Sequence, residues 1–402
     1  MKLPPTHIGV AVMIGVGFAL LPLSTDLFLA SLPGIRTYFD VTVSQAQLTL
    51  SVFLAGFAIS QLVYGPLSDR FGRRPVLLGG IAIYVAATVV CFSTQTMDGL
   101  IAARFFQAVG ACSGAVIGRA IIRDTYGAAG SARMLGYITA GTAATPVFGP
   151  MIGSLMTVSL GWRANFVLLG LISAALLTAT MLRLPESHLE RDPNATNPRH
   201  LVANYIAILR DRRFVGYALC VGFSYAAIFS YISGSPFVLI DVLGVPPKYF
   251  GFLFGGAVIS YIASNILLGK LVQRTGVDRL LRVGASLAAL GGTLMAVLAY
   301  LGVQSVAAVL LPMMIVLFAT GLTMPGSTAG AIGQFGRMTG AASSAVGFTQ
   351  MAIGAYAGFL VGRLHDGTTW PMAASICAAT WLLLASFRLL VLPDRERRRE
   401  AS

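Results

Sequence analysis

The chain is poor in charge, which excludes a soluble globular protein. Only 11% of its 402 residues are charged, whereas soluble domains carry about 25%. Hydrophobic residues make up 56% of the chain. Apolar segments of about 18 residues or more recur along its whole length, and each is long enough to cross a bilayer core of about 30 Å. The composition therefore predicts a polytopic membrane protein.

The chain also lacks the residue clusters on which metal sites and most enzymes depend. Its cysteines lie inside apolar runs and outside any C-x-x-C pattern, as small packing residues do. Its histidines fall at span ends or in loops, without the spacing of metal ligands. We therefore expect no enzymatic activity, no metal and no cofactor. The residues are Cys91, Cys112, Cys220, Cys377, His7, His188, His200 and His365.

The formal net charge of +13 comes from arginines and lysines in the short segments between apolar runs. No soluble segment is large enough to present a basic patch, so we expect no nucleic-acid partner. Most of the 28 Lys and Arg residues fall on one side of the membrane if the N-terminus is cytoplasmic. Because short cytoplasmic loops are enriched in positive charge, this asymmetry predicts that both termini are cytoplasmic.

We predict an all-α membrane protein of twelve spanning helices, because an open sheet cannot satisfy its backbone polar groups in lipid. The longest polar stretch begins PESHLERDPNATNPRH and separates the sixth span from the seventh. We expect an N-terminal six-helix half (1–184), a cytoplasmic linker (185–212) and a C-terminal six-helix half (213–402). The predicted spans are 8–31, 43–65, 75–95, 99–121, 132–157, 163–184, 213–235, 248–270, 279–300, 305–326, 340–362 and 370–392.

One charged stretch between two apolar runs occurs twice. Residues 65–75 read GPLSDRFGRRP, and residues 269–279 read GKLVQRTGVDR, a degraded copy. Gly72 of the first copy corresponds to Gly276 of the second. Six spans are thus followed by six related spans in the same orientation, as in transporters whose site lies near the midplane between two halves. We expect each copy to form the cytoplasmic turn between the second and third spans of its half.

Several stretches resemble signatures of the major facilitator superfamily. GPLSDRFGRRP is similar to its signature between spans 2 and 3, and RFFQAVGACSGAVIGRAIIRD (104–124) to that of span 4. TPVFGPMIG (145–153) resembles the span 5 signature of its antiporter members. STDLFLASLP (24–33) and QLTLSVFLAGFAISQLVYGPLSDRFGRRP look like the bicyclomycin/chloramphenicol resistance (Bcr/CflA) subfamily. The resemblance covers most of the N-terminal half, and the C-terminal half matches mainly in helix pattern.

The resemblance implies the major facilitator fold, with twelve transmembrane helices in two six-helix pseudo-repeats. It implies a proton-coupled multidrug efflux antiporter in a bacterial inner membrane, driven by the proton gradient alone. Its substrates would be small, largely apolar compounds similar to chloramphenicol or bicyclomycin. The alternative is a proton-coupled exporter of a single metabolite on the same fold. The expected partners are drugs or metabolites, protons and the lipid bilayer, and we expect a monomer.

Two charged residues inside predicted spans are candidates for proton coupling. Asp26 is the only acid within a predicted span, and such groups mark ion pathways because they are costly in lipid. Pro22 should bend the helix and help turn this acid inward. Arg104 is the only basic residue that we do not assign to the segments at the ends of the spans, and it could influence the protonation of a nearby carboxylate; the resemblance links it to proton coupling. The alternatives are an acid at a helix end and a snorkelling arginine.

The charged stretch itself is a candidate cytoplasmic gate. Its glycines allow a tight turn, and its acid can lie near the N-terminus of another helix, a contact of about 0.3–1 kcal/mol. Its arginines can pair with this acid or with acids of the opposite half; for the arginines alone, membrane topology is an alternative. The second copy has Gln273 in place of the acid, so the latch would be one-sided. The candidates are Gly65, Asp69, Arg70, Gly72, Arg73 and Arg74.

Two further sets complete the candidate site. The resemblance predicts that a Pro/Gly series on span 5 packs against span 8, with generic small-residue packing as the alternative. Substrate contacts are expected from polar and aromatic residues of the spans, because broad sites are mostly apolar and aromatic. The span 5 series is Pro146, Gly149, Pro150 and Gly153. The substrate candidates are Gln61, Tyr64, Gln107, Phe223, Tyr225, Phe229, Tyr231, Tyr261 and Asn265.

Overall fold

The computed structural model describes residues 4, 6–188, 190–336 and 338–392. All regular elements in this part of the chain are helical. They are α1 (Ile8–Asp26), η1 (Leu29–Ser31), α2 (Leu32–Phe39), α3 (Val43–Phe71), α4 (Arg73–Ser93), α5 (Met97–Thr142), α6 (Thr145–Leu160), α7 (Arg163–Arg183), α8 (Pro198–Arg210), α9 (Arg212–Pro236), η2 (Phe237–Val242), α10 (Pro247–Thr275), α11 (Val277–Tyr300), α12 (Val306–Ile332), α13 (Thr339–Arg363), α14 (Trp370–Ser386) and η3 (Phe387–Val391).

Twelve segments of this described part are long and apolar enough to cross a membrane, which confirms the predicted number of spans. The largest difference from the predicted boundaries is in the first span, which continues through η1 and α2 to Phe39. The second span extends to Phe71, because α3 remains helical through Pro66 and the first part of the charged stretch. The expectation that Gly65 belongs to a tight turn is therefore wrong. The turn is made by Gly72 alone, at φ 98° and ψ 154°.

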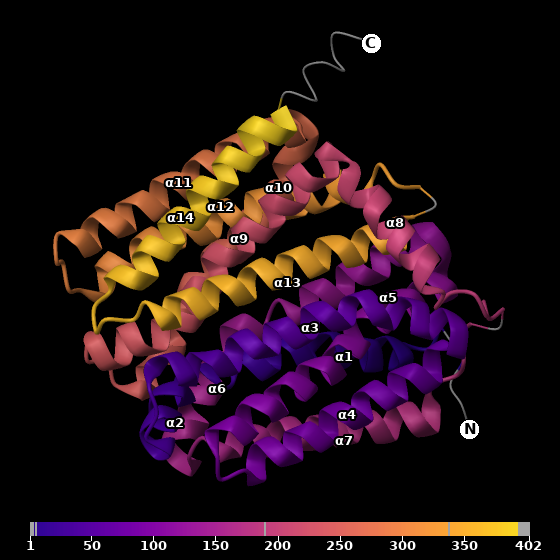
Figure 1. Ribbon diagram of the computed structural model, residues 1–402, viewed down its shortest axis with the longest axis horizontal. Coiled ribbons are helices and arrows are strands. Elements are labelled where there is room, and N and C mark those ends of the chain that lie inside the picture. Colours follow the sequence, from indigo (N-terminus) through magenta and orange to yellow (C-terminus); the bar gives the residue numbers. More distant parts are fainter. Residues whose placement is uncertain (1–3, 5, 189, 337, 393–402) are drawn as a thin grey trace.

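Two groups of helices lie side by side in Figure 1, α1–α7 and α9–α14, which we call the N-terminal and C-terminal halves. The label α8 lies at the end of the bundle where the described chain begins and ends (Figure 1), which we call the terminal end. The label α2 lies at the opposite end, the far end. The halves meet along two helix pairs, α3 with α13 and α6 with α10.

Small residues let the halves approach closely along the α3–α13 contact. A Cβ atom added at Gly347 of α13 would overlap the side chain of Gln61 in α3. One added at Gly362 would crowd the side chain of Gln47, also in α3. Close approach of this kind is how helices gain packing energy in lipid, where apolar surface alone gives little drive to associate.

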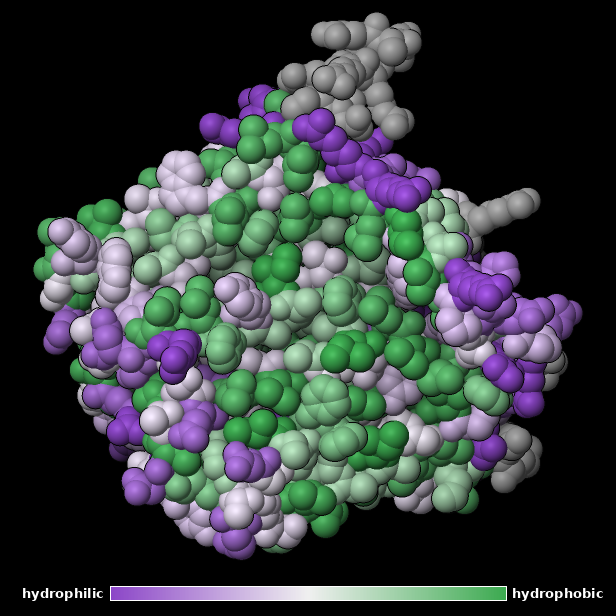
Figure 2. Space-filling view, viewed as in Figure 1, coloured by the Kyte–Doolittle hydropathy of each residue, from purple (hydrophilic) through white to green (hydrophobic). Residues whose placement is uncertain are grey.

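The outer surface agrees with a membrane-embedded body. Figure 2 shows apolar residues over much of the visible face, with hydrophilic residues gathered toward the two ends of the bundle. Exposed side chains in the middle of the spans include Ile152, Leu171 and Leu290. Such residues would be unfavourable in water but are suited to contact with lipid.

Candidate functional site

A cavity of about 230 Å³ lies between the two halves. Its walls come from α1 and α6 on one side and from α9, α10, α12 and α13 on the other. It is lined by Leu21, Pro22, Thr25, Asp26, Pro146, Tyr225, Ile228, Tyr231, Ile232, Phe254, Val258, Tyr261, Leu317, Met324 and Gln350. Among the described residues, Asp26 is the only one with a formal charge in this lining, so the cavity combines an apolar, aromatic surface with a single carboxyl group.

Asp26 is the last residue of α1, at the point where the first span changes from an α helix to the short turn η1. Its exposed fraction is 3%, and it is the nineteenth residue of a segment that runs on to Phe39, which does not fit an acid at the end of a span. Its Oδ1 accepts a hydrogen bond from the Thr25 hydroxyl at 3.2 Å, and its Oδ2 has no hydrogen-bond partner among the residues that the structure describes. Burying an isolated ionised carboxylate is costly, so this environment fits the neutral form.

Gly149 makes room for this acid. A Cβ atom added there would lie 2.9 Å from the Asp26 Cβ. The helix α6 can therefore pass close to the break in the first span only because Gly149 has no side chain. One turn later, a Cβ at Gly153 would overlap the backbone of Leu27. The glycine face of α6 thus packs against the first span.

This differs from the predicted packing of span 5, which assigned the glycine face to span 8. The helix α10 does lie along α6, but the close approach uses glycines of α10. A Cβ at Gly251 would overlap the carbonyl of Pro150. The amide of Gly251 also donates a hydrogen bond to the Ser154 hydroxyl at 3.0 Å. The predicted contact between spans 5 and 8 is present, and Pro150 of the predicted series takes part in it, but the glycines that permit the close approach belong to α10.

The wall opposite Asp26 is aromatic. Tyr231 and Phe254 stack with ring centroids 5.2 Å apart and an interplanar angle of 11°. Tyr225 and Tyr261 line the same wall. Of the nine predicted substrate contacts, Tyr225, Tyr231 and Tyr261 line the cavity, and the other six do not. The residues that sequence reasoning missed, such as Phe254 and Gln350, carry no local signal because apolar and amide side chains occur throughout the spans.

The six remaining candidates pack against other parts of the protein instead of lining the cavity. Gln61 lies against Gly347 in the α3–α13 contact, and the Tyr64 hydroxyl lies near Gly80. The amide nitrogen of Asn265 donates to the carbonyl of Tyr261 at 2.8 Å. The others, Gln107, Phe223 and Phe229, are packed inside their own halves.

Arg104 is completely buried within the N-terminal half, so it does not snorkel. Its guanidinium carbon lies 4.7 Å from the Phe28 ring centroid and 4.2 Å from that of Phe53. One guanidinium nitrogen donates to the Gln107 side chain at 2.6 Å. No hydrogen bond or ion pair joins Arg104 to Asp26 within the described residues. The predicted influence on Asp26 is therefore not a direct contact.

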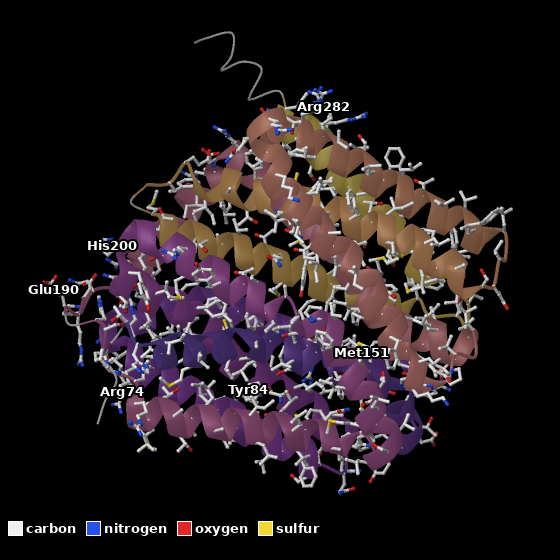
Figure 3. All side chains as sticks on the ribbon, turned by 180° about the vertical axis from the view of Figure 1, so that it is seen from behind. Arg74, Tyr84, Met151, Glu190, His200 and Arg282 are labelled. Carbon is white, nitrogen blue, oxygen red and sulfur yellow. The ribbon has the colours of Figure 1, made fainter. Side chains whose placement is uncertain are left out.

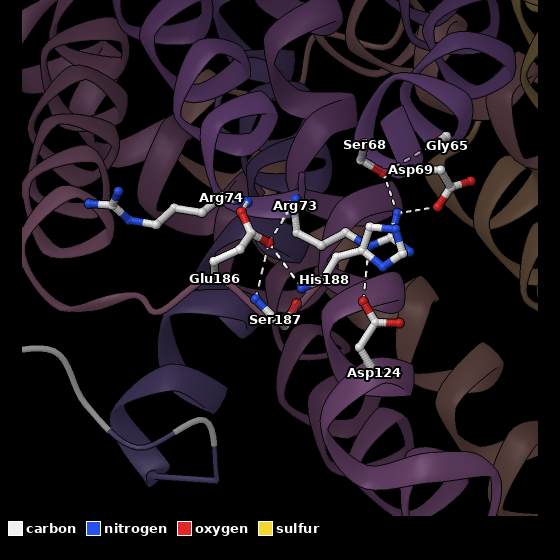
Figure 4. A network of polar contacts seen from close by, with 9 residues as sticks. All are labelled: Gly65, Ser68, Asp69, Arg73, Arg74, Asp124, Glu186, Ser187 and His188. Atoms are coloured by element: carbon white, nitrogen blue, oxygen red, sulfur yellow. Dashed lines mark hydrogen bonds and ion pairs between the residues drawn. The ribbon is translucent and has the colours of Figure 1, made fainter. Parts of the chain in front are cut away.

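The charged stretch forms a network at the terminal end (Figure 4). Arg73 is 7% exposed and contacts two acids: Asp69 at 2.5 Å and Asp124 at 3.0 Å. Asp124 lies in α5 three residues before the kink at Gly127, near the end of the fourth span. Its guanidinium also donates to the Ser68 hydroxyl at 2.6 Å. Arg73 therefore ties the end of α3 to α5, and all three partners belong to the N-terminal half.

The linker supplies the carboxylate at the start of α4. Glu186 accepts hydrogen bonds from the backbone amides of Arg73 at 2.9 Å and Arg74 at 3.1 Å. A carboxylate is favourable there because unpaired amides and the helix dipole make a helix N-terminus positive. We predicted this role for Asp69, and the structure gives it to Glu186. The nearest sequence signal is that α4 begins with two arginines and no acid of its own.

Of the two pairings expected for the arginines, Arg73 makes the one with Asp69; among the described residues, no ion pair joins this stretch to an acid of the opposite half. Arg70 donates to the hydroxyl of Thr196 at 2.5 Å, and the carbonyl of Asp69 accepts from the amide of Asp192 at 3.1 Å. Both partners belong to the linker. Arg74 donates to the carbonyl of Met181 at 2.7 Å. An ion pair between the halves occurs instead at the far end, where Arg36 contacts Asp241 at 3.1 Å.

Two of the labelled side chains help to locate these parts in Figure 3. Arg74 lies at the terminal end, and Tyr84 lies among the helices of the N-terminal half. The Tyr84 hydroxyl is 2.6 Å from that of Ser24. Within the described residues, no group of three or more His, Cys, Asp or Glu side chains could hold a metal ion.

Comparisons with known proteins agree with this architecture. Residues 14–358 match the model of the Major Facilitator Superfamily. An uncharacterized MFS-type transporter, YdgK of Bacillus subtilis, is 31% identical over 92% of each chain. A bicyclomycin resistance protein homolog of Haemophilus influenzae is 26% identical over 94% of each chain.

The fold also resembles a solved structure at low sequence identity. A bacterial homolog of the human lysosomal transporter Spinster, in an inward-facing and occupied conformation, matches with a TM-score of 0.75 at 14% identity, over 98% of each chain. The twelve spans, the cavity between two halves and the match over most of the chain lead to one conclusion. The protein is a transporter of the Major Facilitator Superfamily.

Proposed function

We propose that this protein is a proton-coupled efflux antiporter of the bicyclomycin/chloramphenicol resistance type, which exports small, largely apolar compounds across a bacterial inner membrane. The terminal end would face the cytoplasm, in agreement with the arginine distribution. The halves, residues 1–184 and 213–402, would rock against each other about the cavity while residues 185–212 link them. The name of the Haemophilus influenzae relative supports a drug as substrate.

The observation that carries this proposal is a lone buried carboxyl group in an aromatic cavity. Asp26 has one oxygen without a partner, and no cation contacts it within the described part of the chain. A proton carrier must alternate between a shielded neutral form and a hydrated charged form. The position of Asp26 at the break between α1 and η1 suits this task, because a small shift of the break would change its exposure.

Arg104 would act on this step indirectly. Its guanidinium lies between the rings of Phe28 and Phe53, and cation–π contacts of this kind are worth about 2 kcal/mol or more when desolvated. Phe28 belongs to the segment that follows Asp26. We propose that Arg104 holds this segment in place and thereby sets how readily Asp26 becomes exposed.

A single proton-carrying side chain limits the free energy that the proton gradient supplies in each transport cycle. With about one proton per cycle, export of a neutral compound moves about one charge inward, and the membrane potential contributes roughly 2.3 kcal/mol per 100 mV. Export of a monovalent cation would move no net charge. A pH difference of one unit would then supply about 1.4 kcal/mol, enough for about tenfold accumulation.

The test is Asp26→Asn, which keeps the size of the side chain and fixes it in a neutral form. Ligand binding to purified protein should persist, while gradient-driven transport into proteoliposomes should be lost. Asp40→Asn is the matched control, because Asp40 is an exposed acid outside the spans. Full concentrative transport by the Asp26 variant would remove this residue from the coupling mechanism.

Export of a single metabolite remains the second candidate, favoured by the size of the cavity. Its volume of about 230 Å³ lies just below the usual range for ligand sites, about 300–1,000 Å³. A growth screen of a pump-deficient host against diverse toxic compounds separates the two. Protection against several unrelated compounds supports multidrug export, and protection against one compound supports the metabolite exporter.

A further inference from the structure

The helix α8 is short, lies outside the spans and carries an apolar stripe that no part of the described chain covers. Val202, Ile206 and Leu209 are 57%, 45% and 54% exposed. Their spacing of four and three residues places them on one side of the helix. Exposed aliphatic side chains are expected on the spans, where they meet lipid, but α8 belongs to the linker between the halves.

A different side of α8 attaches it to the bundle. Ile208 is completely buried, and Tyr205 packs beside it in the same apolar cluster. The Tyr205 hydroxyl is 3.4 Å from the carbonyl of Leu62 in α3, and α8 also contacts α9 and α13. The helix therefore rests on both halves. At about 100° per residue, the exposed stripe is roughly a quarter turn away from this attached side.

The border of the stripe is positively charged. Arg199 and Arg210 are exposed, and on a helical wheel with about 3.6 residues per turn they lie next to the stripe, on the side away from the bundle. The helix itself contains no acidic residue. Asp211, which follows it, is engaged in capping α9, since its side chain accepts from the amide of Phe214 at 2.8 Å.

The helix also cannot leave the membrane surface. Only Asp211 separates α8 from α9, which is a membrane span. In Figure 3, His200 of α8 lies at the terminal end of the molecule, beyond the apolar spans. An apolar stripe bordered by arginines and held at the edge of a bilayer is the pattern of a helix that lies in the membrane interface.

We propose that α8 binds anionic phospholipids of the leaflet at the terminal end. Val202, Ile206 and Leu209 enter the boundary between headgroups and acyl chains, and Arg199 and Arg210 contact the headgroup phosphates. Arginine suits this role because its planar guanidinium donates two parallel hydrogen bonds to a phosphate. The inference is independent of which substrate the protein carries and of which leaflet is cytoplasmic.

The test uses tryptophan as a probe of lipid contact. Ile206→Trp places the probe on the stripe, and Ala207→Trp places it one residue further round the helix. Each variant is reconstituted in vesicles that contain phosphatidylcholine and phosphatidylglycerol in equal amounts, with bromine on the acyl chains of one lipid or of the other. The fluorescence of the unsubstituted protein, which has three tryptophans, is subtracted.

The probe at position 206 should be quenched by bromine, and more strongly when the brominated lipid is phosphatidylglycerol. Each arginine should favour the anionic lipid about fivefold. Adding Arg199→Gln and Arg210→Gln should abolish this preference while quenching remains, whereas Arg191→Gln, an exposed linker arginine outside α8, should leave the preference intact. The probe at position 207 should be quenched less.

Two results would overturn the proposal. Equal quenching by both lipids at position 206 would mean that the helix does not select anionic headgroups. Absence of quenching there would mean that water or protein covers the stripe. Native mass spectrometry gives a second measurement without any tryptophan variant: phosphatidylglycerol should stay bound to the unsubstituted protein and be lost from the Arg199→Gln/Arg210→Gln variant, and equal retention by both would contradict the proposal.

Discussion

The two copies of the charged stretch have similar backbones and different chemistry. Gly72 ends α3 at φ 98° and ψ 154°, and Gly276 ends α10 at φ 74° and ψ 155°. In both copies the next residue begins a helix that follows without a loop. A left-handed backbone of this kind is almost restricted to glycine, so the conserved feature of the repeat is the turn itself.

The side chains around the two turns differ. After Gly72 comes Arg73, which contacts Asp124 of α5. After Gly276 comes Val277, whose side chain would lie 3.1 Å from a Cβ added at Gly326 of α12. The first copy thus joins neighbouring helices by an ion pair, and the second joins them by apolar packing.

The starts of the following helices differ as well. The helix α11 has an acid, Asp278, in its first turn, whereas α4 has none and begins with two arginines. Glu186 of the linker supplies the missing carboxylate at α4. The turn itself requires only glycine. The charges of the first copy therefore have a role that is absent from the second copy. We infer that they couple the N-terminal half to the linker.

The largest difference in stability between matched variants of the two copies is expected when their glycines are replaced. Gly72→Ala and Gly276→Ala both strain the backbone, at a cost of about 1–3 kcal/mol each. At position 72 the new Cβ would also lie 2.8 Å from Oε2 of Glu186, whereas at position 276 nothing lies within 4 Å. The thermal midpoint should therefore fall further for Gly72→Ala, because the carboxylate must also move away from α4.

Thiol reactivity can measure this unfolding, because Cys91, Cys112 and Cys220 are buried in the folded protein and become reactive as it opens. Gly276→Ala is the matched control. Equal falls in the midpoint of the two variants would mean that Glu186 contributes nothing measurable at the start of α4.

The second-largest loss of stability is expected when Arg73 is replaced. Arg73→Gln leaves Asp69 and Asp124 without the cation that they share. The loss should exceed the 0–1 kcal/mol or so of an exposed ion pair and stay below the roughly 3–5 kcal/mol of a fully buried one, because the Asp69 side chain is 44% exposed. Arg70→Gln is the control, since Arg70 makes its hydrogen bond to a linker hydroxyl. Similar thermal midpoints for the two variants would contradict this ranking.

Local signals account for what could be predicted from the sequence. Twelve spans follow from the length of apolar runs, and Asp26 stands out because an acid inside such a run is rare. Aromatic residues give no such signal: Tyr231 lines the cavity and Phe223 does not, although both lie on α9. The face that a helix turns toward a cavity depends on its neighbours, and helices that are apolar on all sides give no periodic signal.

The contacts that could not be predicted join distant parts of the chain. The Glu186–Arg73 bond spans 113 residues, and nothing near Glu186 in the sequence points to α4. Asp69 was expected near a helix N-terminus, but the linker places the carboxylate of Glu186 at the start of α4 instead. Likewise, Gly251 rather than Gly153 permits the contact between α6 and α10, since small residues occur on both helices and only the packing decides between them.

A smaller effect is expected for Asp69→Asn, which should change the conformational balance more than the stability. Asn keeps the size of the side chain but loses the charge that pairs with Arg73. The pair lies within the N-terminal half, so it would act on closure through the linker, which Asp69 and Arg70 contact. If it does, the variant should favour the form open at that end. A bias of about 1 kcal/mol would change the population ratio about fivefold. Distances between spin labels on the two halves at this end would report the change.

The control for this experiment is Gln273→Asn, the corresponding position in the second copy, which should leave the distances unchanged. An unaltered distance distribution in Asp69→Asn, together with normal transport, would mean that the acid has no part in the latch. A change in both variants would assign the effect to the ends of the helices in general.

The smallest effect is expected from rebuilding the first copy in the second. Gln273→Asp with Val277→Arg restores an acid and an arginine four residues apart, as in Asp69 and Arg73. Gln273 is exposed, and exposed pairs at this spacing contribute only about 0.2–0.5 kcal/mol. Replacing Val277 also removes its apolar contact beside Gly326. The described part of the second copy shows no acid in the position that Asp124 has beside Arg73. A double-mutant cycle on thermal midpoints should therefore give a coupling near the lower limit of detection, far below that between Arg73 and its two acids. A coupling as large as in the first copy would show that the turn alone determines the strength of the pair, and that neither Asp124 nor the linker is needed to explain the charges.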